Sequence, residues 1–312
     1  MTGPSAVAAT GRRFGDRVAD HVAARESQIV LGLDPDPSRL WPGSGEGVPA
    51  DGPPAARAAA AVAAHCRAVI AAVAPAVVAV KPQLACFERL GAPGRAALGA
   101  AVEAAHEHGL LVLADGKRGD IDVSATAYAQ SLVGTTPTPY GDVPGLGADA
   151  LTAAPYMGVD TIDSLLAVTR PAGAGVFVLV RTSNPGAADV EDLELAGGGP
   201  LWEHVARIVD RLGEGDGAAL HDVGAVVGAT RPEHVARMRE LMPRAVFLLP
   251  GVGAQGGRVE DLAPAWAPGP AGGLATASRS IVQAAERGGV GTPAAAARAE
   301  AERLRDAAWS LA

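Results

Sequence analysis

The chain has few aromatic residues, few cysteines and no excess of basic residues. Aromatic side chains make up 4% of its 312 residues, and its two cysteines, Cys66 and Cys86, form no CxxC pair and have no histidine partners at metal-ligand spacing. We therefore expect both thiols to be buried apolar groups and not metal ligands. A formal net charge of -8 argues against a general binder of nucleic acids or acidic membranes. These absences favour a protein that acts on small molecules.

Neither a secretory signal nor a membrane span is evident in the sequence. The opening segment MTGPSAVAATGRRFGDRV has no continuous apolar stretch after its basic residues. The alanine-rich segment 55–80 is interrupted by basic residues and by Pro75, so it falls short of the roughly 20 apolar residues that a membrane span requires. We predict a helix followed by a strand in this segment, and a cytoplasmic location for the protein.

The remaining composition is that of a globular α/β protein. Hydrophobic residues make up 48% of the chain and charged residues 19%, which is ample for a large core. Short runs of Val, Ile and Leu alternate with longer Ala-, Arg- and Glu-rich segments, as buried parallel strands alternate with helices. The predicted strands cover 28–34, 76–82, 110–117, 150–155, 175–183, 224–230, 245–251 and 272–280. The predicted helices cover 11–25, 55–74, 93–108, 124–132, 158–170, 200–213, 232–242, 258–265 and 293–311.

Eight β/α units favour a closed (β/α)8 TIM barrel over a doubly wound sheet, which usually has fewer strands. We expect one barrel domain over 1–312, with an N-terminal helix and loop insertions near 41–54, 134–147 and 184–200. The first and third insertions leave C-terminal strand ends, so either is a candidate lid. A barrel builds its site from the loops that follow the C-terminal ends of its strands. Functional residues are therefore expected just after each strand.

Charged side chains follow the first three predicted strands. Asp34 ends the first strand and Lys81 the second, while Asp115, Lys117 and Asp120 follow the third. In a partly dry pocket, neighbouring carboxylates repel one another unless cations lie between them. An alternating array of these lysines and aspartates keeps its members ionised and prepares an ammonium group to donate a proton to developing negative charge. The alternative is a solvated turn with surface ion pairs.

A glycine-rich loop follows the seventh predicted strand. Gly251, Gly253 and Gly256 have G-x-G-x-x-G spacing, but a dinucleotide-binding fold places this motif after its first strand. Loops after strands seven and eight of a barrel commonly hold a phosphate, and Gln255 with Arg279 suits a phosphomonoester. The alternative is a tight turn with Arg279 at the surface.

The fifth predicted strand ends in RTSNPGA, where Ser183 and Asn184 suit hydrogen bonding to a planar polar ring, although an ordinary turn has a similar composition. The histidines lie away from strand ends. The sequence also has no nucleophile elbow and no clustered His and Cys ligands, which disfavours covalent serine or cysteine catalysis and zinc chemistry.

Taken together, the strand-end motifs resemble those of orotidine 5'-phosphate decarboxylases, most closely the longer bacterial (type 2) branch. The four most specific segments are ADGKRGDI (114–121), VLVRTSNPGA (178–187), PGVGAQGG (250–257) and SRSI (278–281), in the family's order. The resemblance implies a homodimer that converts orotidine 5'-phosphate to UMP in pyrimidine biosynthesis, without a metal or other cofactor.

The resemblance also implies a role for each matched residue. Lys81, Asp115, Lys117 and Asp120 correspond to a catalytic tetrad in which Asp120 reaches into the neighbouring subunit's site, and Lys117 stabilises and then protonates the carbanion. The implied substrate contacts are Asp34 and Ser124 to the ribose, Ser183 to the pyrimidine amide, Gln255 to phosphate and base through a closing loop, Arg279 to the phosphate, and Gly256 and Gly257 in the phosphate loop. The chain departs from the family at Ser124, often Thr, and at Ala154, where relatives commonly have Asn.

Two other functions compete with this one. Metal-dependent sugar-phosphate lyases of similar barrel type also carry a DxKxxD-like motif, but they bind Mg²⁺, and Lys81 with the Ser183 loop favours a pyrimidine substrate. A non-catalytic phosphate-binding barrel is the second alternative, in which a complete charged tetrad would have little use.

Overall fold

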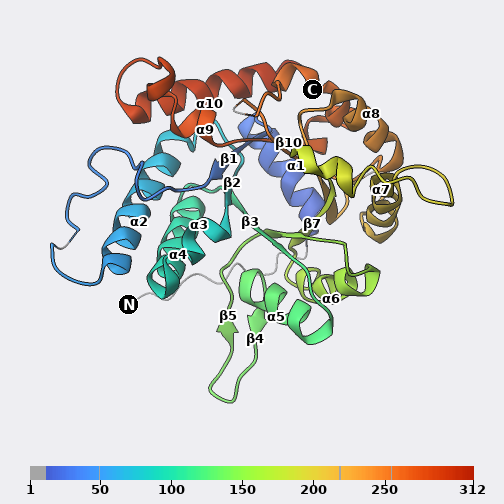
Figure 1. Ribbon diagram of the computed structural model, residues 1–312, viewed down its shortest axis with the longest axis horizontal. Helices are drawn as coiled ribbons and strands as arrows, with labels where there is room; N and C mark the ends of the chain where they lie inside the picture. The colour runs from blue at the N-terminus through green and yellow to red at the C-terminus, as the bar shows by residue number, and fades with distance from the viewer. Residues whose placement is uncertain (1–11, 49, 218, 254) are drawn as a thin grey trace.

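Eight parallel strands form a closed barrel in the computed structural model, which describes residues 12–48, 50–217, 219–253 and 255–312 (Figure 1). The strands follow one another around the barrel in chain order. Their bounds are β1 Ile29–Leu33, β2 Ala79–Pro82, β3 Leu111–Arg118, β6 Ala150–Ala153, β7 Gly175–Arg181, β8 Val223–Val227, β9 Phe247–Pro250 and β10 Gly273–Ala277. The predicted TIM barrel is confirmed, and each predicted strand overlaps one barrel strand.

The strands are buried on both sides, which explains why they appear in the sequence as continuous apolar runs. In β1, Ile29 and Leu31 pack in the layer between the strands and the surrounding helices, whereas Val30 packs inside the barrel. Successive side chains of a strand point to opposite faces, so each barrel strand contributes to both layers. The barrel interior is thus a packed core, with Phe177 and Leu248 among its members.

The helix α1 (Phe14–Arg25) fills the N-terminal mouth of this interior core. Phe14 packs edge-to-face on Phe177 with the ring centroids 5.7 Å apart, and Val18 and Val22 join the same cluster. Gly175, the first residue of β7, leaves the space for this contact, because a Cβ atom there would overlap the Phe14 ring. With this end filled by α1, the cavity described below lies at the C-terminal ends of the strands.

Helices surround the barrel on its outside, as expected for β/α alternation (Figure 1). The longer ones are α2 Pro54–Val73, α4 Gly91–Glu107, α5 Asp122–Leu132, α6 Val159–Thr169, α7 Leu201–Leu212, α8 Pro232–Leu241 and α10 Pro293–Trp309, and the short ones are α3 Leu84–Glu88 and α9 Arg279–Val282. By length and composition, α2 is the one helix in the described ranges that could cross a membrane. Here it packs against the barrel through buried residues such as Val62 and Val69.

The prediction of a helix over 258–265 is wrong. This segment forms only the 3-10 turns η2 (Val259–Asp261) and η3 (Ala263–Trp266), followed by η4 (Pro270–Gly272). Pro264 cannot donate a helical hydrogen bond, and the following WAPGPAGG stretch is rich in helix breakers. The Arg239 side chain donates to the carbonyls of Ala265 and Gly272, and thereby holds this irregular segment against the barrel.

The three predicted insertions have different structures. Residues 134–147 contain an antiparallel hairpin of β4 (Thr135–Thr136) and β5 (Val143–Pro144), which extends beyond α5 in Figure 1. Residues 184–200 contain the 3-10 turn η1 (Pro185–Asp189) and return to the end of β7. The described part of 41–54 consists of turns and bends before α2.

Candidate active site

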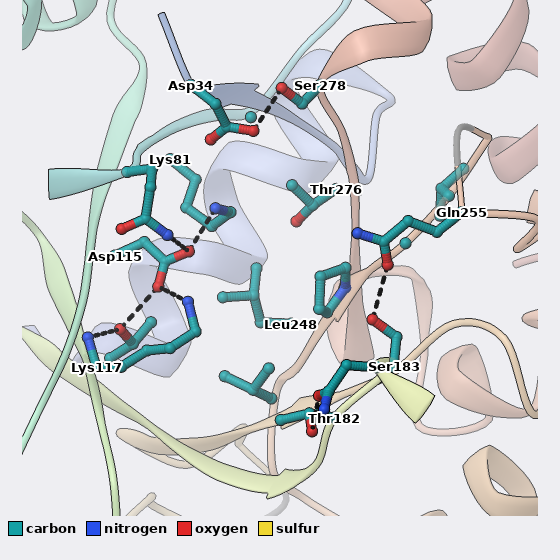
Figure 2. A pocket seen from close by; sticks show the side chains of 18 of the residues that line it. Asp34, Lys81, Asp115, Lys117, Thr182, Ser183, Leu248, Gln255, Thr276 and Ser278 are labelled. Atoms are coloured by element: carbon teal, nitrogen blue, oxygen red, sulfur yellow. Dashed lines mark hydrogen bonds and ion pairs between the residues drawn. The ribbon is translucent and has the colours of Figure 1, made fainter. Parts of the chain in front are cut away.

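A cavity of about 560 Å³ opens at the C-terminal ends of the barrel strands. Polar and charged side chains from β1, β2, β3, β6, β7, β10 and the following loops line it, while Val226 and Leu248 provide apolar surface. Figure 2 shows Lys81, Asp115 and Lys117 on one side of this cavity and Ser183 with Gln255 on the opposite side. The predicted position of the site, after the strand ends, is therefore where the cavity lies.

Asp115 lies between the two predicted lysines. Its Oδ2 accepts a hydrogen bond from Lys81 Nζ and its Oδ1 accepts one from Lys117 Nζ, both at 2.6 Å. Lys81 and Asp115 are buried, whereas the side chain of Lys117 remains 43% exposed. The predicted alternation of lysine and aspartate is thus present for these three residues, and Lys117 is the cation that solvent or a ligand can reach.

The electrostatics of this cluster keep Asp115 ionised. Burial by itself would raise the pKa of Asp115, but the charges of Lys81 and Lys117 and their hydrogen bonds outweigh burial and lower the pKa to about 2. Gln83 Nε2 donates a further hydrogen bond to Oδ2 at 3.3 Å. A carboxylate with this many donors remains negative at any physiological pH, so Asp115 is unsuited to act as a proton donor.

The backbone of Lys117 has an unusual conformation. Its φ of 47° lies in the left-handed region, and the pairing of β3 with β6 shifts register between Ala114 and Arg118. Such a conformation costs a non-glycine residue on the order of 1 kcal/mol and persists only where its surroundings stabilise it. This irregularity turns the end of β3 so that both the Asp115 and Lys117 side chains lie in the cavity wall.

Thr152, the third residue of β6, connects these two features. Its Oγ1 accepts the backbone N–H of Lys117 at 2.8 Å and donates to Asp115 Oδ1 at 3.0 Å. The side chain is buried and lines the cavity. Thr152 had no predicted role. A polar residue within the apolar run ALTAAP was the available signal, because such a residue has to be hydrogen-bonded when it is buried.

A second polar pair joins β1 to β10. Ser278 Oγ donates to Asp34 Oδ2 at 2.8 Å, and both residues line the cavity. The strands approach closely here because Gly32 has no side chain; a Cβ at this position would lie 2.8 Å from Ser278 Cβ. Asp34 is exposed. The structure therefore brings the predicted residue Asp34 to the same cavity as the lysine cluster.

Ser183 and Gln255 meet on the opposite wall. Ser183 Oγ donates to Gln255 Oε1 at 2.8 Å, joining the loop after β7 to the loop after β9. Arg279, at the start of α9, also lines the cavity and is exposed. Within the described ranges no carboxylate lies within ion-pair distance of the Arg279 guanidinium, so its charge is available to an anionic group.

The two predicted phosphate-loop glycines do not line the cavity. Gly256 N–H donates to the carbonyl of Gly253, and Gly257 N–H donates to the carbonyl of Gly251. Gly256 has a φ of 92°, which favours glycine, and the loop closes on itself between Val252 and Gly257. In this conformation both N–H groups hydrogen-bond within the turn, while Arg279 lines the cavity. The role of these two glycines in a phosphate loop stays a prediction.

Asp120 and Ser124 also lie outside the cavity of their own chain. Asp120 accepts the N–H of Ile121 through Oδ1 at 2.8 Å, and Ser124 is exposed near the start of α5. Neither belongs to the cavity wall. Ala154 follows β6 without a polar side chain, and its N–H donates to the carbonyl of Arg118. The single chain thus brings together three of the four residues of the predicted tetrad.

Four further polar residues of the wall had no predicted role: Gln83, Thr182, Glu191 and Thr276. The Thr276 hydroxyl is buried without a partner in the described part of the chain. No histidine or cysteine of this part lines the cavity, and no group of three or more His, Cys, Asp or Glu side chains there is arranged to hold a metal ion. The cavity has the character of an anion site, since ammonium and guanidinium groups reach it from two sides.

The family model described as "Orotidine 5'-phosphate decarboxylase / HUMPS family" matches residues 27–292. A curated relative from Deinococcus radiodurans, named orotidine 5'-phosphate decarboxylase, is 41% identical over 296 residues, which cover 94% of this chain and 96% of the relative. These matches extend over all eight barrel strands and every wall residue named above.

Solved structures agree with this result. A protein from Streptomyces avermitilis has a TM-score of 0.78 and 29% identity, with 96% of each chain covered. The Leishmania donovani UMP synthase has a TM-score of 0.71 and 32% identity, covering 96% of this chain. This chain spans only 57% of that longer synthase, so the similarity concerns one part of it.

Proposed function

The chain belongs to the orotidine 5'-phosphate decarboxylase / HUMPS family and is a carboxy-lyase of pyrimidine biosynthesis, and we propose that it converts orotidine 5'-phosphate to UMP without a metal ion or other cofactor. The observation that carries this proposal is the Lys81–Asp115–Lys117 cluster, which faces a cavity that Arg279 also lines. We expect the enzyme to act in the cytoplasm as a homodimer.

In the proposed mechanism, the bond between C6 and the carboxylate breaks and its electron pair remains on C6. The ammonium of Lys117 stabilises this negative charge and then transfers a proton to C6, forming the C6–H bond of UMP. Lys117 regains its proton from solvent after the product leaves. Its 43% exposed side chain, next to the buried Lys81–Asp115 pair, supports this assignment of the donor.

Asp115 has a different role in this mechanism. Because it stays ionised, it holds both ammonium groups in position and places a negative charge near the region where CO₂ is formed. Repulsion between Asp115 and the substrate carboxylate would be relieved as neutral CO₂ departs. Stabilisation of the carbanion by Lys117 carries the larger share of the proposed catalysis, since it acts on charge that develops only in the transition state.

The substrate contacts follow from the opposite walls of the cavity. We propose that Arg279 binds the phosphate, that Asp34 contacts the ribose, and that Ser183 with Gln255 contacts the pyrimidine. The Ser183–Gln255 hydrogen bond supports a pairing of these two loops around the base. Closure of the Gln255 loop on the phosphate, with Gly256 and Gly257 in the turn, would couple phosphate binding to turnover.

A second copy of the chain would complete the site. Asp120 and Ser124 lie outside their own cavity, and the surface beside them exposes large apolar side chains: Ile121 at 55%, Val123 at 76% and Tyr156 at 89%. Exposed apolar residues grouped around two neighbouring strand ends are typical of a covered interface. We propose that this surface forms the dimer contact through which Asp120 and Ser124 enter the partner's site.

The decisive test is an absorbance assay of the purified protein with orotidine 5'-phosphate in the presence of EDTA. We expect UMP to form at an undiminished rate, because the two oxygens of Asp115 are occupied by ammonium groups and not arranged for a divalent cation. Activity that disappears in EDTA and returns with Mg²⁺ would instead indicate a metal-dependent sugar-phosphate lyase. Binding of the nucleotide without loss of CO₂ would indicate a non-catalytic barrel.

Mixing two inactive variants tests the shared site. Lys117→Ala and Asp120→Ala each remove one component from both sites of a homodimer. A mixed dimer would have one site that lacks both and one site that is intact, so random exchange should restore about a quarter of the wild-type activity. No recovery after verified subunit exchange would show that Asp120 acts within its own chain or not at all.

A further inference from the structure

The insertion 184–200 returns to the end of β7 and is attached there by an arginine. Arg181, which is buried, donates to both carboxylate oxygens of Asp192 at 2.8 and 3.0 Å and to the carbonyl of Thr182 at 2.6 Å. The same guanidinium donates to Glu191 Oε2 at 3.4 Å. The bidentate pair with Asp192 anchors the insertion, and this anchor leaves Glu191 at the wall of the cavity.

Glu191 binds the residue that precedes the proposed base-contacting serine. Its Oε2 accepts the backbone N–H of Thr182 at 2.9 Å, and its Oε1 lies 3.0 Å from Thr182 Oγ1. On its other side, Thr182 Oγ1 lies 2.7 Å from Asn184 Oδ1. Thr182, Asn184 and Glu191 all line the cavity. The three side chains therefore form one connected chain of polar contacts in the wall, which we call the relay.

The number of protons determines the direction of these hydrogen bonds. A threonine hydroxyl has one proton, and an ionised carboxylate can only accept. The Thr182 proton therefore goes to Glu191, which is the charged acceptor and forms the stronger bond. Thr182 Oγ1 can then only accept from Asn184. The Asn184 amide must therefore reverse the orientation in which Oδ1 faces Thr182, and place its Nδ2 there. The two orientations of an amide have nearly the same shape, and the hydrogen-bond network decides between them.

We propose that Glu191 is a positioning residue that sets the hydrogen-bond direction of the base-binding wall through Thr182. With Nδ2 held by Thr182, Asn184 presents its carbonyl oxygen to the cavity as an acceptor. A base with an N–H at its ring edge, such as uracil or orotate, matches this acceptor, whereas cytosine has an acceptor nitrogen at the corresponding ring position. This inference rests on the proposed function and adds the residues that select the type of pyrimidine.

The test compares the affinities of UMP, CMP and ribose 5-phosphate by titration calorimetry. Glu191→Gln keeps the size of the side chain but gives it an N–H₂ group that can donate to Thr182. The relay can then reverse, which turns the Asn184 amide and exposes its Nδ2 to the ligand. Thr182→Val removes the hydroxyl at nearly constant shape, and Thr182→Ser keeps it.

We expect the wild-type protein and Thr182→Ser to prefer UMP over CMP, and we expect this preference to fall by about tenfold or more in Glu191→Gln and Thr182→Val. Ribose 5-phosphate has no base, so its affinity should stay within about twofold in every variant. An unchanged preference in both Glu191→Gln and Thr182→Val would overturn the proposal. So would a parallel loss of ribose 5-phosphate affinity, because that would indicate general disruption of the loop.

Asp192→Asn provides the matched control for loop anchoring. This change weakens the pair with Arg181 without touching the Glu191–Thr182–Asn184 contacts, so it should lower the melting temperature and retain the preference for UMP. A loss of preference in Asp192→Asn equal to that in Glu191→Gln would contradict the relay. Turnover of orotidine 5'-phosphate by the wild-type protein is measured separately, so that failure of the proposed activity is distinguishable from failure of the relay.

Discussion

Lys81 and Arg239 are both buried cations, but they lie at opposite ends of the barrel and have different partners. Lys81, at the C-terminal end of β2, is paired with the carboxylate of Asp115 beside the cavity. Arg239, near the end of α8, has no carboxylate partner in the described part of the chain and donates to backbone carbonyls, including those of Ala245 and Gly272 at 2.8 Å. Its guanidinium also lies 3.7 Å from the centre of the Phe247 ring.

The difference shows that burying a positive charge, which costs free energy because the charge loses its water, can serve either stability or chemistry. Burial lowers the pKa of Arg239 to about 9, so the group stays charged at neutral pH. Neutral carbonyls accept from its two terminal nitrogens, whereas its Nε has no partner in the described part of the chain. Its donors are used to hold the segment between η3 and η4 in place, and none points to a ligand. In the Lys81–Asp115–Lys117 cluster the charges alternate and one ammonium remains accessible. A buried charge is therefore a functional candidate when its surroundings leave one side open to a cavity.

Lys117→Ala should give the largest effect and separates activity from stability at the C-terminal end. We expect kcat to fall by about 10³-fold or more, because the proton donor and the main stabiliser of the carbanion are both lost. The melting temperature should change little, since Lys117 is half exposed and Asp115 keeps its bond to Lys81. Single-turnover absorbance and thermal melts measure both quantities.

Lys117→Arg is the matched control for this variant. Arginine keeps the positive charge but does not release its proton at accessible pH, so it should restore substrate affinity and not turnover. Near-normal turnover by Lys117→Ala would refute the proposed donor.

Arg239→Ala should give the opposite result. Removal of the guanidinium leaves several buried carbonyls without donors, and we expect a loss of about 3 kcal/mol in the free energy of unfolding. The kcat of the folded fraction should be unchanged. Urea titrations and an assay below the melting temperature test this, with Arg239→Lys as a control that keeps the charge but cannot reach all the carbonyls. A variant that is stable but inactive would contradict the separation between the two ends.

Thr152→Val tests whether the Thr152 hydroxyl positions Lys117 and Asp115 within the cluster. The change keeps the shape but removes the hydroxyl that joins the Lys117 N–H to Asp115, so we expect kcat to fall by about 10- to 100-fold with a smaller change in KM. Thr152→Ser should restore most of the activity. An equal loss in both variants would show that packing of the methyl group, and not the hydrogen bonds, is what matters at this position.

Acid should affect the two cation sites unequally. The pKa of Asp115 is lowered to about 2 in the folded protein from an ordinary 3.8, so its stabilising contribution is complete above pH 4 and is lost as the pH falls toward 2. We expect this contribution to be about 2 kcal/mol. The pH dependence of unfolding between pH 4 and 2 should therefore be shallower in Asp115→Asn than in the wild type. Arg239→Lys should retain the wild-type slope; identical slopes in all three proteins would contradict the assignment.

Much of the barrel and part of the site could be predicted without coordinates. Strands buried on both sides produce apolar runs, and in a barrel the residue after such a run lies at the functional face, which identified Asp34, Lys81, Asp115 and Lys117. The helix predicted over 258–265 failed because Pro264 and the tertiary contacts of Arg239 override the local pattern. The roles of Asp120 and Ser124 stay predictions, because one chain does not contain the partner that they are proposed to reach.

The order of residue types along the chain was enough to predict which residues end each barrel strand, because short apolar runs that form strands alternate with longer segments that form helices. Two sets of contacts became apparent only in the folded structure: Thr152 joins Asp115 to Lys117, and Glu191, nine residues after Thr182, folds back to reach it. These contacts depend on the register between β3 and β6 and on the path of the 184–200 insertion. A hydrogen bond forms only when its donor and acceptor are placed to within a few tenths of an ångström. The pattern of residue types along the chain does not encode positions with that precision.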